Sequence, residues 1–165
     1  MSALAARHAP AGPQPSRPSS ATAPSTVNGD GDSRGRAPLG PFRVWLVDPD
    51  PAIQASISWL LRHLPVELET FRYGEDFLAQ SDLTVPGCVL VDTDLPDTSG
   101  LDVLRAVQRR TSGKVAVVVL ASSPDVHLAV QALREGAADF FEKPFLGAAL
   151  TRRVESAMAD ARRDA

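Results

Sequence analysis

From Pro41 onward the chain alternates short apolar runs with amphipathic segments. The apolar runs are rich in Val, Leu and Phe, which is typical of strands buried on both faces of a sheet. The segments between them carry apolar residues three and four positions apart, as in helices that cover a sheet. Strands are predicted at 42–47, 66–71, 88–91, 115–120 and 138–141, and helices at 51–63, 74–81, 100–110, 124–135 and 146–162. Five strand–helix units predict an α/β fold with a parallel sheet.

Local signals mark several element ends. Asp50 is a good N-cap, and Pro51 suits the first position of the helix 51–63. Gly136 is a natural residue to end the helix 124–135. The strand 66–71 alternates apolar and acidic residues, as an edge strand does. We expect Trp45, Trp59 and Cys88 in the core, and His63 and His127 on helix surfaces.

Composition narrows the class of protein. With 165 residues, 44% hydrophobic and 22% charged, the chain is ordinary for one globular domain. A formal net charge of −3 offers no basic patch for nucleic acid. The single cysteine, Cys88, has no partner for an intramolecular disulfide. The first ten residues lack an apolar leader, and no run is long enough to span a membrane, so we expect a cytoplasmic protein.

The first 41 residues differ from the rest. They hold seven of the fourteen prolines and five of the eleven glycines. Such a composition cannot bury a core, so residues 1–41 are predicted to be a disordered tail and residues 42–163 the folded domain. A flexible tether, a partner-binding arm and translated upstream sequence all remain open for the tail.

Two acids and one lysine follow three of the predicted strands. Asp48 ends the strand 42–47, Asp92 ends 88–91, and Lys143 follows 138–141. In a parallel sheet the carboxyl ends of the strands share one edge, where such folds bind ligands. Lysine is rare here, with two lysines against fifteen arginines, so a compact ammonium at this place suggests a geometric need. The alternatives are that Asp92 is only a turn residue and that Lys143 is a surface charge paired with Glu142.

Three motifs in a fixed order then indicate a family. They are the acid after the first strand, the stretch 90–100 with Leu95-Pro96 and Ser99-Gly100, and the stretch 137–145 with Lys143-Pro144. The region 42–158 resembles the receiver domain of bacterial two-component response regulators, most closely receivers that precede LuxR-type helix-turn-helix domains. The resemblance implies a (βα)5 flavodoxin-like three-layer sandwich with sheet order 2-1-3-4-5 and a cis Lys143–Pro144 bond. It also implies that Asp92 accepts a phosphoryl group from a histidine kinase with Mg²⁺, in a protein that is not an enzyme.

The residues support that chemistry on physical grounds. Phosphoryl transfer to a carboxylate needs an accessible nucleophile, a cation for the phosphoryl oxygens and a fixed positive charge. Asp92, Mg²⁺ and Lys143 would fill these roles. Because Mg²⁺ takes oxygen ligands and keeps several waters, Asp48, Asp92 and the backbone carbonyl of Asp94 would suffice to hold it.

Two departures from the family pattern weaken the expectation of strong Mg²⁺ binding and of a full response to phosphorylation. Pro49 stands where most receivers have a second acid, and Asp50 would point elsewhere if it caps a helix, so weak Mg²⁺ binding is expected. Ala121 stands where the family has Thr or Ser to hydrogen-bond the phosphoryl group. Phe140 matches the aromatic switch position, but without that hydroxyl we expect blunted switching. Ser122 or Ser123 would substitute only if the loop were shifted by one residue.

Several partners and functions follow from the resemblance. A sensor histidine kinase is the expected phosphoryl donor, and a homodimer would use the helices 124–135 and 146–162 with the strand 138–141. The apolar residues of that surface are Val126, Ala129, Val130 and Leu133, with Leu146 and Leu150 behind. About twenty residues follow Lys143, so no DNA-binding output domain is expected. 

Two other functions stay open. A pseudo-receiver would use the same fold as a phosphorylation-independent dimerisation or docking module. A flavodoxin-like FMN protein fits less well, because the loop 48–51 lacks the Ser, Thr and Gly residues that cradle a phosphate.

Overall fold

The computed structural model describes residues 40–123 and 125–165. The predicted tail 1–41 therefore lies almost wholly outside the described residues. The strands are β1 (Phe42–Val47), β2 (Val66–Phe71), β3 (Gly87–Asp92), β4 (Ala116–Ala121) and β5 (Asp139–Glu142). The helices are α1 (Pro51–Leu61), α2 (Gly74–Gln80), α3 (Gly100–Thr111), α4 (Val126–Arg134) and α5 (Gly147–Asp164). All ten predicted elements exist, with ends within two residues of the prediction.

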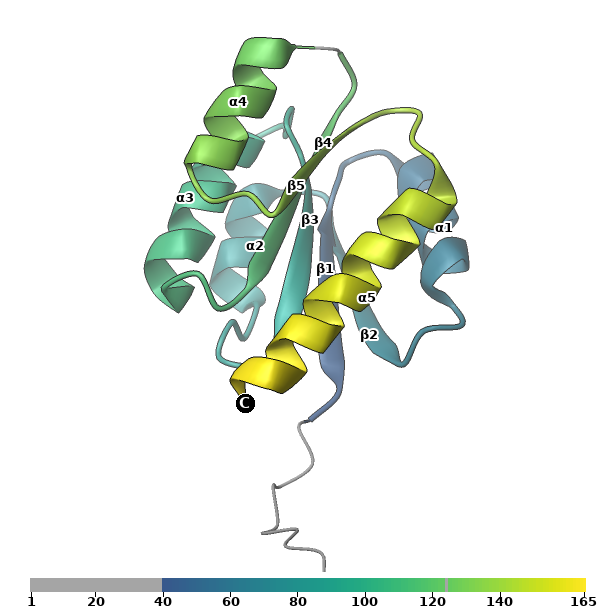
Figure 1. Cartoon of the computed structure of the whole chain (residues 1–165). Coiled ribbons are helices and arrows are strands. Elements are labelled where there is room, and N and C mark those ends of the chain that lie inside the picture. The colour runs from purple at the N-terminus through teal and green to yellow at the C-terminus, as the bar shows by residue number, and fades with distance from the viewer. Residues whose placement is uncertain (1–39, 124) are drawn as a thin grey trace, which may run out of the picture. The chain divides into compact units, whose positions relative to one another are not determined.

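The strands form one parallel sheet in the order β2-β1-β3-β4-β5. Helices α1 and α5 cover one face, and α2, α3 and α4 cover the other (Figure 1). The predicted three-layer (βα)5 fold, its strand order and the edge position of β2 are confirmed. Strands β1, β3 and β4 are adjacent and parallel, so their carboxyl ends lie side by side at the same end of the sheet.

Each face of the sheet carries its own apolar core. Successive residues of a strand point to opposite faces, so Trp45 and Val47 pack under α2 and α3 while Val44 and Leu46 pack under α1 and α5. Covering on both faces explains why these strands read as continuous apolar runs. Cys88 is fully buried in the second core, and burial raises the pKa of its thiol to about 12.

Capping residues fix the helix ends. Asp50 Oδ1 accepts a hydrogen bond from Ala52 N at 2.8 Å, which confirms the predicted N-cap of α1. Helix α4 begins two residues later than predicted, because Asp125 Oδ1 accepts from Leu128 N at 3.1 Å and so caps the helix. Gly136 follows α4 with φ of +99°, a conformation that glycine adopts without strain. The peptide bond between Lys143 and Pro144 is cis, as expected.

The prediction that Trp59 lies in the core is wrong. Its side chain is 63% exposed, and the Arg62 guanidinium stacks 3.7 Å from the ring centroid. The buried residues of α1 are Ile57 and Leu61, which lie four positions apart and face the sheet. Trp59 is two positions from each, about 200° around the helix, so it faces outward.

Candidate functional site

The candidate site lies at the carboxyl ends of the central strands. Asp48 follows β1 directly, Asp92 is the last residue of β3, and Lys143 follows β5. The two acids are neighbours because β1 and β3 are paired, with Val47 opposite Val91. Lys143 comes from the far side of β4, where its backbone N donates to Ala121 O at 2.7 Å. The parallel topology therefore brings together three residues that are far apart in sequence.

The lysine forms an ion pair with both acids. Lys143 Nζ lies 2.5 Å from Asp48 Oδ2 and 3.4 Å from Asp92 Oδ1. Asp48 is fully buried, Asp92 is 5% exposed, and the Lys143 side chain is 12% exposed. At such burial an unpaired charge would be strongly unfavourable, so Asp48 and Lys143 depend on each other. The partners of Lys143 are these acids and not Glu142.

Each carboxylate oxygen of Asp48 already accepts one hydrogen bond. Its Oδ1 accepts from Asp50 N at 2.9 Å, and its Oδ2 accepts from Lys143. Its backbone carbonyl accepts from Gln54 Nε2 at 2.7 Å. Sequence analysis missed Gln54, although its place in the first turn of α1, four residues after the cap Asp50, was a usable signal. These contacts hold Asp48 in a fixed orientation beside Asp92.

Asp92 is the acid with spare capacity. Its Oδ1 is buried and has no hydrogen-bond partner among the described residues, although the ammonium of Lys143 lies within ion-pair distance. Burial raises the pKa of Asp92, the charge of Lys143 opposes that shift, and the negative charges of Asp48 and Asp94 add to it. The net pKa is above the ordinary value. A basic carboxylate with an unused oxygen can serve as a nucleophile or as a cation ligand.

The carboxylates of Asp48 and Asp92 suit a hard cation that needs few protein ligands. Residues 40–123 and 125–165 contain no group of three or more His, Cys, Asp or Glu side chains able to hold a metal ion. The Asp50 carboxylate, which caps α1, is exposed and engaged by Ala52 N. What remains is the pair Asp48 and Asp92, with the unpartnered Asp92 Oδ1 as the available oxygen. Mg²⁺ takes oxygen ligands and keeps several waters, so this pair fits it, though less fully than three acids would.

The two positions expected to control switching, Ala121 and Phe140, lie on adjacent strands but two residues out of register, because Phe140 pairs with Val119. Ala121 ends β4, is 1% exposed and pairs with Glu142 of β5. That register puts Ala121, and not Ser122, at the strand end, so the one-residue shift that would bring a serine hydroxyl into its place does not occur. Ser122 and Ser123 lie beyond the strand and are exposed. Phe140 of β5 is partly buried and packs against the core on the α2–α4 face.

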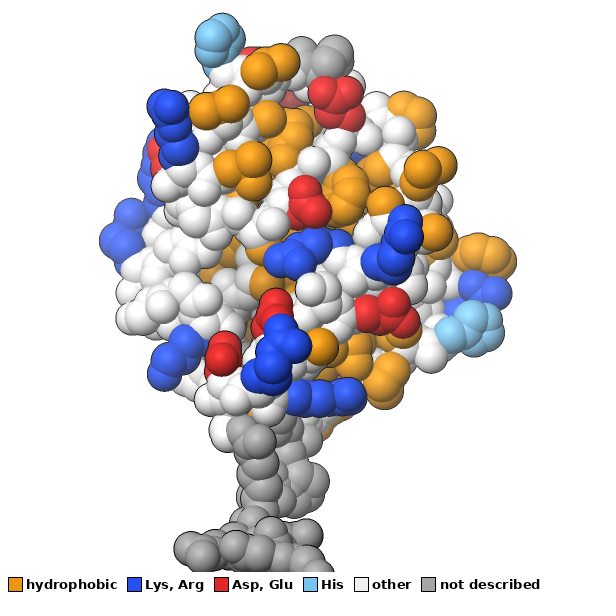
Figure 2. All heavy atoms as spheres, in the orientation of Figure 1, with side chains coloured by type: hydrophobic (Ala, Val, Ile, Leu, Met, Phe, Trp, Pro, Cys, Tyr) orange, Lys and Arg blue, Asp and Glu red, His pale blue; other side chains and the backbone are white. Residues whose placement is uncertain are grey.

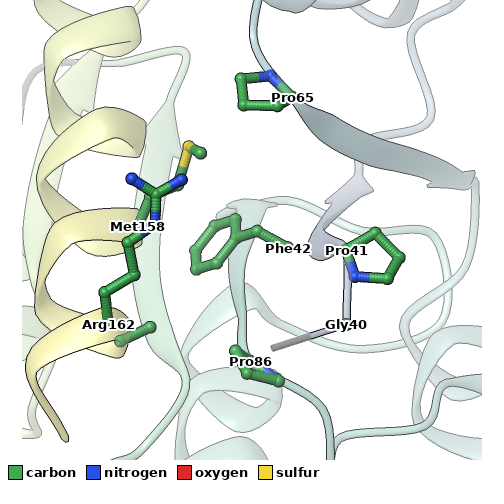
Figure 3. A pocket seen from close by; sticks show the side chains of 8 residues that line it. Gly40, Pro41, Phe42, Pro65, Pro86, Met158 and Arg162 are labelled. Carbon is green, nitrogen blue, oxygen red and sulfur yellow. The ribbon is translucent and has the colours of Figure 1, made fainter. Parts of the chain in front are cut away.

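A separate cavity lies at the opposite end of the strands. It has a volume of about 240 Å³, and the side chains around it are mostly apolar (Figure 3). Its walls include Phe42 at the start of β1, Pro65 before β2, Pro86 before β3, and Met158 and Arg162 of α5. Because these residues mark the amino ends of the strands, the cavity is not part of the acidic site.

Comparisons with known proteins identify the family of this chain. A family model described as the response regulator receiver domain matches residues 44–155. The transcriptional regulatory protein TdiR of Thauera aromatica is 31% identical over 116 residues, which cover 70% of this chain and 51% of TdiR. The transcriptional regulatory protein FixJ of Azorhizobium caulinodans is 36% identical over 118 residues, which cover 70% of this chain and 54% of FixJ. The chain thus spans about half the length of these curated relatives.

Solved structures give the same result. The BeF3-activated receiver domain of DrrB, from Thermotoga maritima, superposes with a TM-score of 0.66 and 29% identity. The match covers 72% of this chain and 97% of the DrrB domain. Across the described part of the chain, no helix combines the length and apolar character needed to cross a membrane. With the parallel 2-1-3-4-5 sheet, the family match over 44–155 shows that this protein belongs to the response regulator family and that this region is a receiver domain.

Proposed function

We propose that Asp92 accepts a phosphoryl group from the phosphohistidine of a sensor histidine kinase. The observation that carries this proposal is the Asp92 carboxylate at the tip of β3, with its Oδ1 unpartnered and Lys143 Nζ 3.4 Å away. The matched relatives are regulators by name, and a phosphoryl acceptor suits that class. We place the reaction in the cytoplasm, where a kinase obtains ATP.

In the proposed transfer, a carboxylate oxygen of Asp92 attacks the phosphorus atom and a new O–P bond forms. The N–P bond breaks, and its electron pair stays on the imidazole nitrogen. Lys143 neutralises the negative charge on the phosphoryl oxygens, which is the main electrostatic requirement of such a reaction. Asp48 keeps the ammonium in place through its 2.5 Å contact.

Mg²⁺ would be held by the carboxylates of Asp48 and Asp92 and by the backbone carbonyl of Asp94. When bound, it supplies positive charge beside the phosphoryl oxygens. Pro49 contributes neither a carboxylate nor a backbone donor. We therefore propose that the site binds Mg²⁺ weakly. Half-saturation should need a higher Mg²⁺ concentration than at a site with three acids.

Intact-mass measurement after incubation with acetyl phosphate and Mg²⁺ tests the proposal. The wild type should gain one phosphoryl group, and hydroxylamine should remove it. Asp92→Asn should gain none. Asp94→Asn is the matched control, because it removes an exposed carboxyl only two residues away and leaves Asp92 intact. Label that persists in Asp92→Asn would move the acceptor elsewhere, and a wild type that takes no label at saturating Mg²⁺ would contradict the proposal.

A pseudo-receiver is the second candidate function. It is favoured by Ala121, which supplies no hydroxyl, and by Lys143, which lies nearer to Asp48 than to Asp92. In this case the domain would act by dimerisation or docking without phosphorylation. Its oligomeric state and its partner binding would then be the same for wild type and Asp92→Asn.

Either function would use an exposed apolar surface over α4 and the start of α5 for a homodimer or a downstream partner. Figure 2 shows hydrophobic side chains gathered over α4. The exposed members are Val126 (76%), Val130 (41%), Leu133 (51%) and Leu146 (78%). Leu150 is fully buried in the core, so of the two residues expected behind this surface only Leu146 is available to a partner. Light scattering with and without beryllofluoride would show whether the surface forms a dimer and whether phosphorylation controls it.

A further inference from the structure

Helix α2 takes its N-terminal cap from a different part of the chain. Its own N-cap residue, Tyr73, makes no side-chain capping bond. The carboxylate of Asp97, in the loop between β3 and α3, accepts from Gly74 N at 3.0 Å and from Glu75 N at 2.8 Å. Both oxygens of one carboxylate thus satisfy backbone donors that a helix start leaves free. The contact joins residues 22 and 23 positions apart.

Close packing holds the same two segments together independently of the carboxylate. A Cβ added at Gly74 would lie 2.4 Å from Thr98 Cγ2 and 2.9 Å from Val103 Cγ2. Only glycine allows α2 to approach the loop this closely. The start of α2 at Gly74 is therefore held against the β3–α3 loop both by the Asp97 carboxylate and by close packing.

The loop that carries Asp97 is closed at its base. Asp94 and Ser99 form an antiparallel bridge, and Gly100 N donates to Thr93 O at 3.0 Å. Asp97 lies at the far end of this closed loop, and Asp94 lies at the base, two residues after Asp92. Because the bridge joins the two ends of a short loop, we expect a displacement of Asp97 to shift Asp94 as well.

We propose that Asp97 is a positioning residue of the phosphoacceptor site, which ties the β3–α3 loop to α2 and so holds the Asp94 backbone carbonyl beside Asp92. This inference rests on the proposed function, in which that carbonyl is a ligand of Mg²⁺. Burial raises the pKa of Asp97, but backbone hydrogen bonds, those from Glu75 and Gly74 foremost, together lower it by more, and the net pKa is below the ordinary value. The carboxylate is thus charged and able to accept both bonds at neutral pH.

The first measurement needs no metal. Hydrogen exchange of the metal-free protein should be several-fold faster at Ser99 and Gly100 in Asp97→Ala than in wild type. Asp97→Asn, which keeps one acceptor oxygen, should lie between them. Asp82→Ala is the matched control, because Asp82 is also an exposed turn acid, accepting from Thr84 N at 3.0 Å, and lies outside the loop. It should exchange like wild type at both amides.

The second measurement separates positioning from general stability. The rate of labelling by acetyl phosphate is followed against Mg²⁺ concentration. Asp97→Ala should raise the half-saturating Mg²⁺ concentration several-fold and leave the limiting rate near that of wild type. Unchanged exchange, or faster exchange with an unchanged half-saturating concentration, would overturn the inference, because Asp97 would then only stabilise α2.

Failure of the proposed function can be recognised separately. If wild type takes no label at any Mg²⁺ concentration, the phosphoacceptor role fails. A direct Mg²⁺ titration monitored by the amide signals of residues 92–100 then decides the inference. Weaker binding in Asp97→Ala than in Asp82→Ala would support it, and equal or undetectable binding in both would overturn it.

Discussion

Lys143 Nζ lies 0.9 Å nearer to an oxygen of Asp48 than to the nearest oxygen of Asp92, at 2.5 Å against 3.4 Å. The acid proposed as nucleophile is thus not the main partner of the ammonium. Asp48 orients the lysine, while Asp92 keeps an oxygen free for reaction. Lys143 thus stabilises a buried acid, and in the proposed function the same ammonium would contact the phosphoryl group.

Removing the lysine should destabilise the fold as well as the chemistry. Lys143→Ala leaves the fully buried Asp48 without its ion-pair partner, and breaking a buried pair costs about 3 kcal/mol or more in free energy of unfolding. Urea denaturation measures the loss. Lys114→Ala removes the only other lysine of the chain, at an exposed position, and should change the free energy by less than about 0.5 kcal/mol. Equal stability of Lys143→Ala and wild type would contradict the importance of this ion pair.

Asp92→Asn should stabilise the protein at neutral pH. Burial raises the pKa of Asp92, so the folded state favours its neutral form and its ionisation opposes folding. The stabilisation contributed by the protonated group is complete below the ordinary pKa of an aspartate and is lost as pH rises through the raised pKa. The variant should therefore exceed wild type by on the order of 1 kcal/mol at pH 7, with a smaller difference near pH 4. Thermal melts across this range would show it; a difference that grows on acidification would contradict it.

Restoring the missing acid should strengthen the cation site. Pro49→Asp adds a carboxylate next to Asp48, and more carboxylates raise the affinity of a hard-cation site. We expect several-fold tighter Mg²⁺ binding. Since Trp59 is 63% exposed, a Trp59→Phe background leaves the buried Trp45, on β1, as the only tryptophan reporter. Equal or weaker affinity would mean that another group already completes the ion's ligands.

A hydroxyl at the end of β4 should strengthen the response to phosphorylation. Ala121→Thr offers the phosphoryl group a hydrogen bond that exists only in the occupied state, worth about 1.5–3 kcal/mol for a bond to a charged group. Beryllofluoride should then cause larger chemical-shift changes along α4 and β5 than in wild type. Ser122→Ala is the control, since this exposed residue lies beyond the strand. No response in wild type and none gained in Ala121→Thr would favour the pseudo-receiver.

Local pattern predicted most of the fold, because the central strands β1, β3 and β4 are buried on both faces and the helices carry apolar stripes. The positions of Asp48, Asp92 and Lys143 at one edge followed from parallel topology alone. Trp59 was misplaced because its angle around α1, on the side opposite Ile57 and Leu61, was not taken into account. Pro124 was taken as the start of α4, although Asp125 was the better cap. The capping of α2 by Asp97 was beyond reach, because it joins segments more than twenty residues apart and has no periodic signature.

Because Pro49 carries no charge, the pocket of the unphosphorylated domain holds fewer negative charges than a three-acid site. With two carboxylates and one ammonium, the pocket carries a formal charge of −1, and Lys143 already offsets half of its acidity. A pocket so nearly neutral has little electrostatic need of a divalent counter-ion. The unphosphorylated domain should therefore melt at nearly the same temperature in a chelator as in millimolar Mg²⁺, because weak binding of the ion adds little stability, and it should keep its fold where divalent ions are scarce.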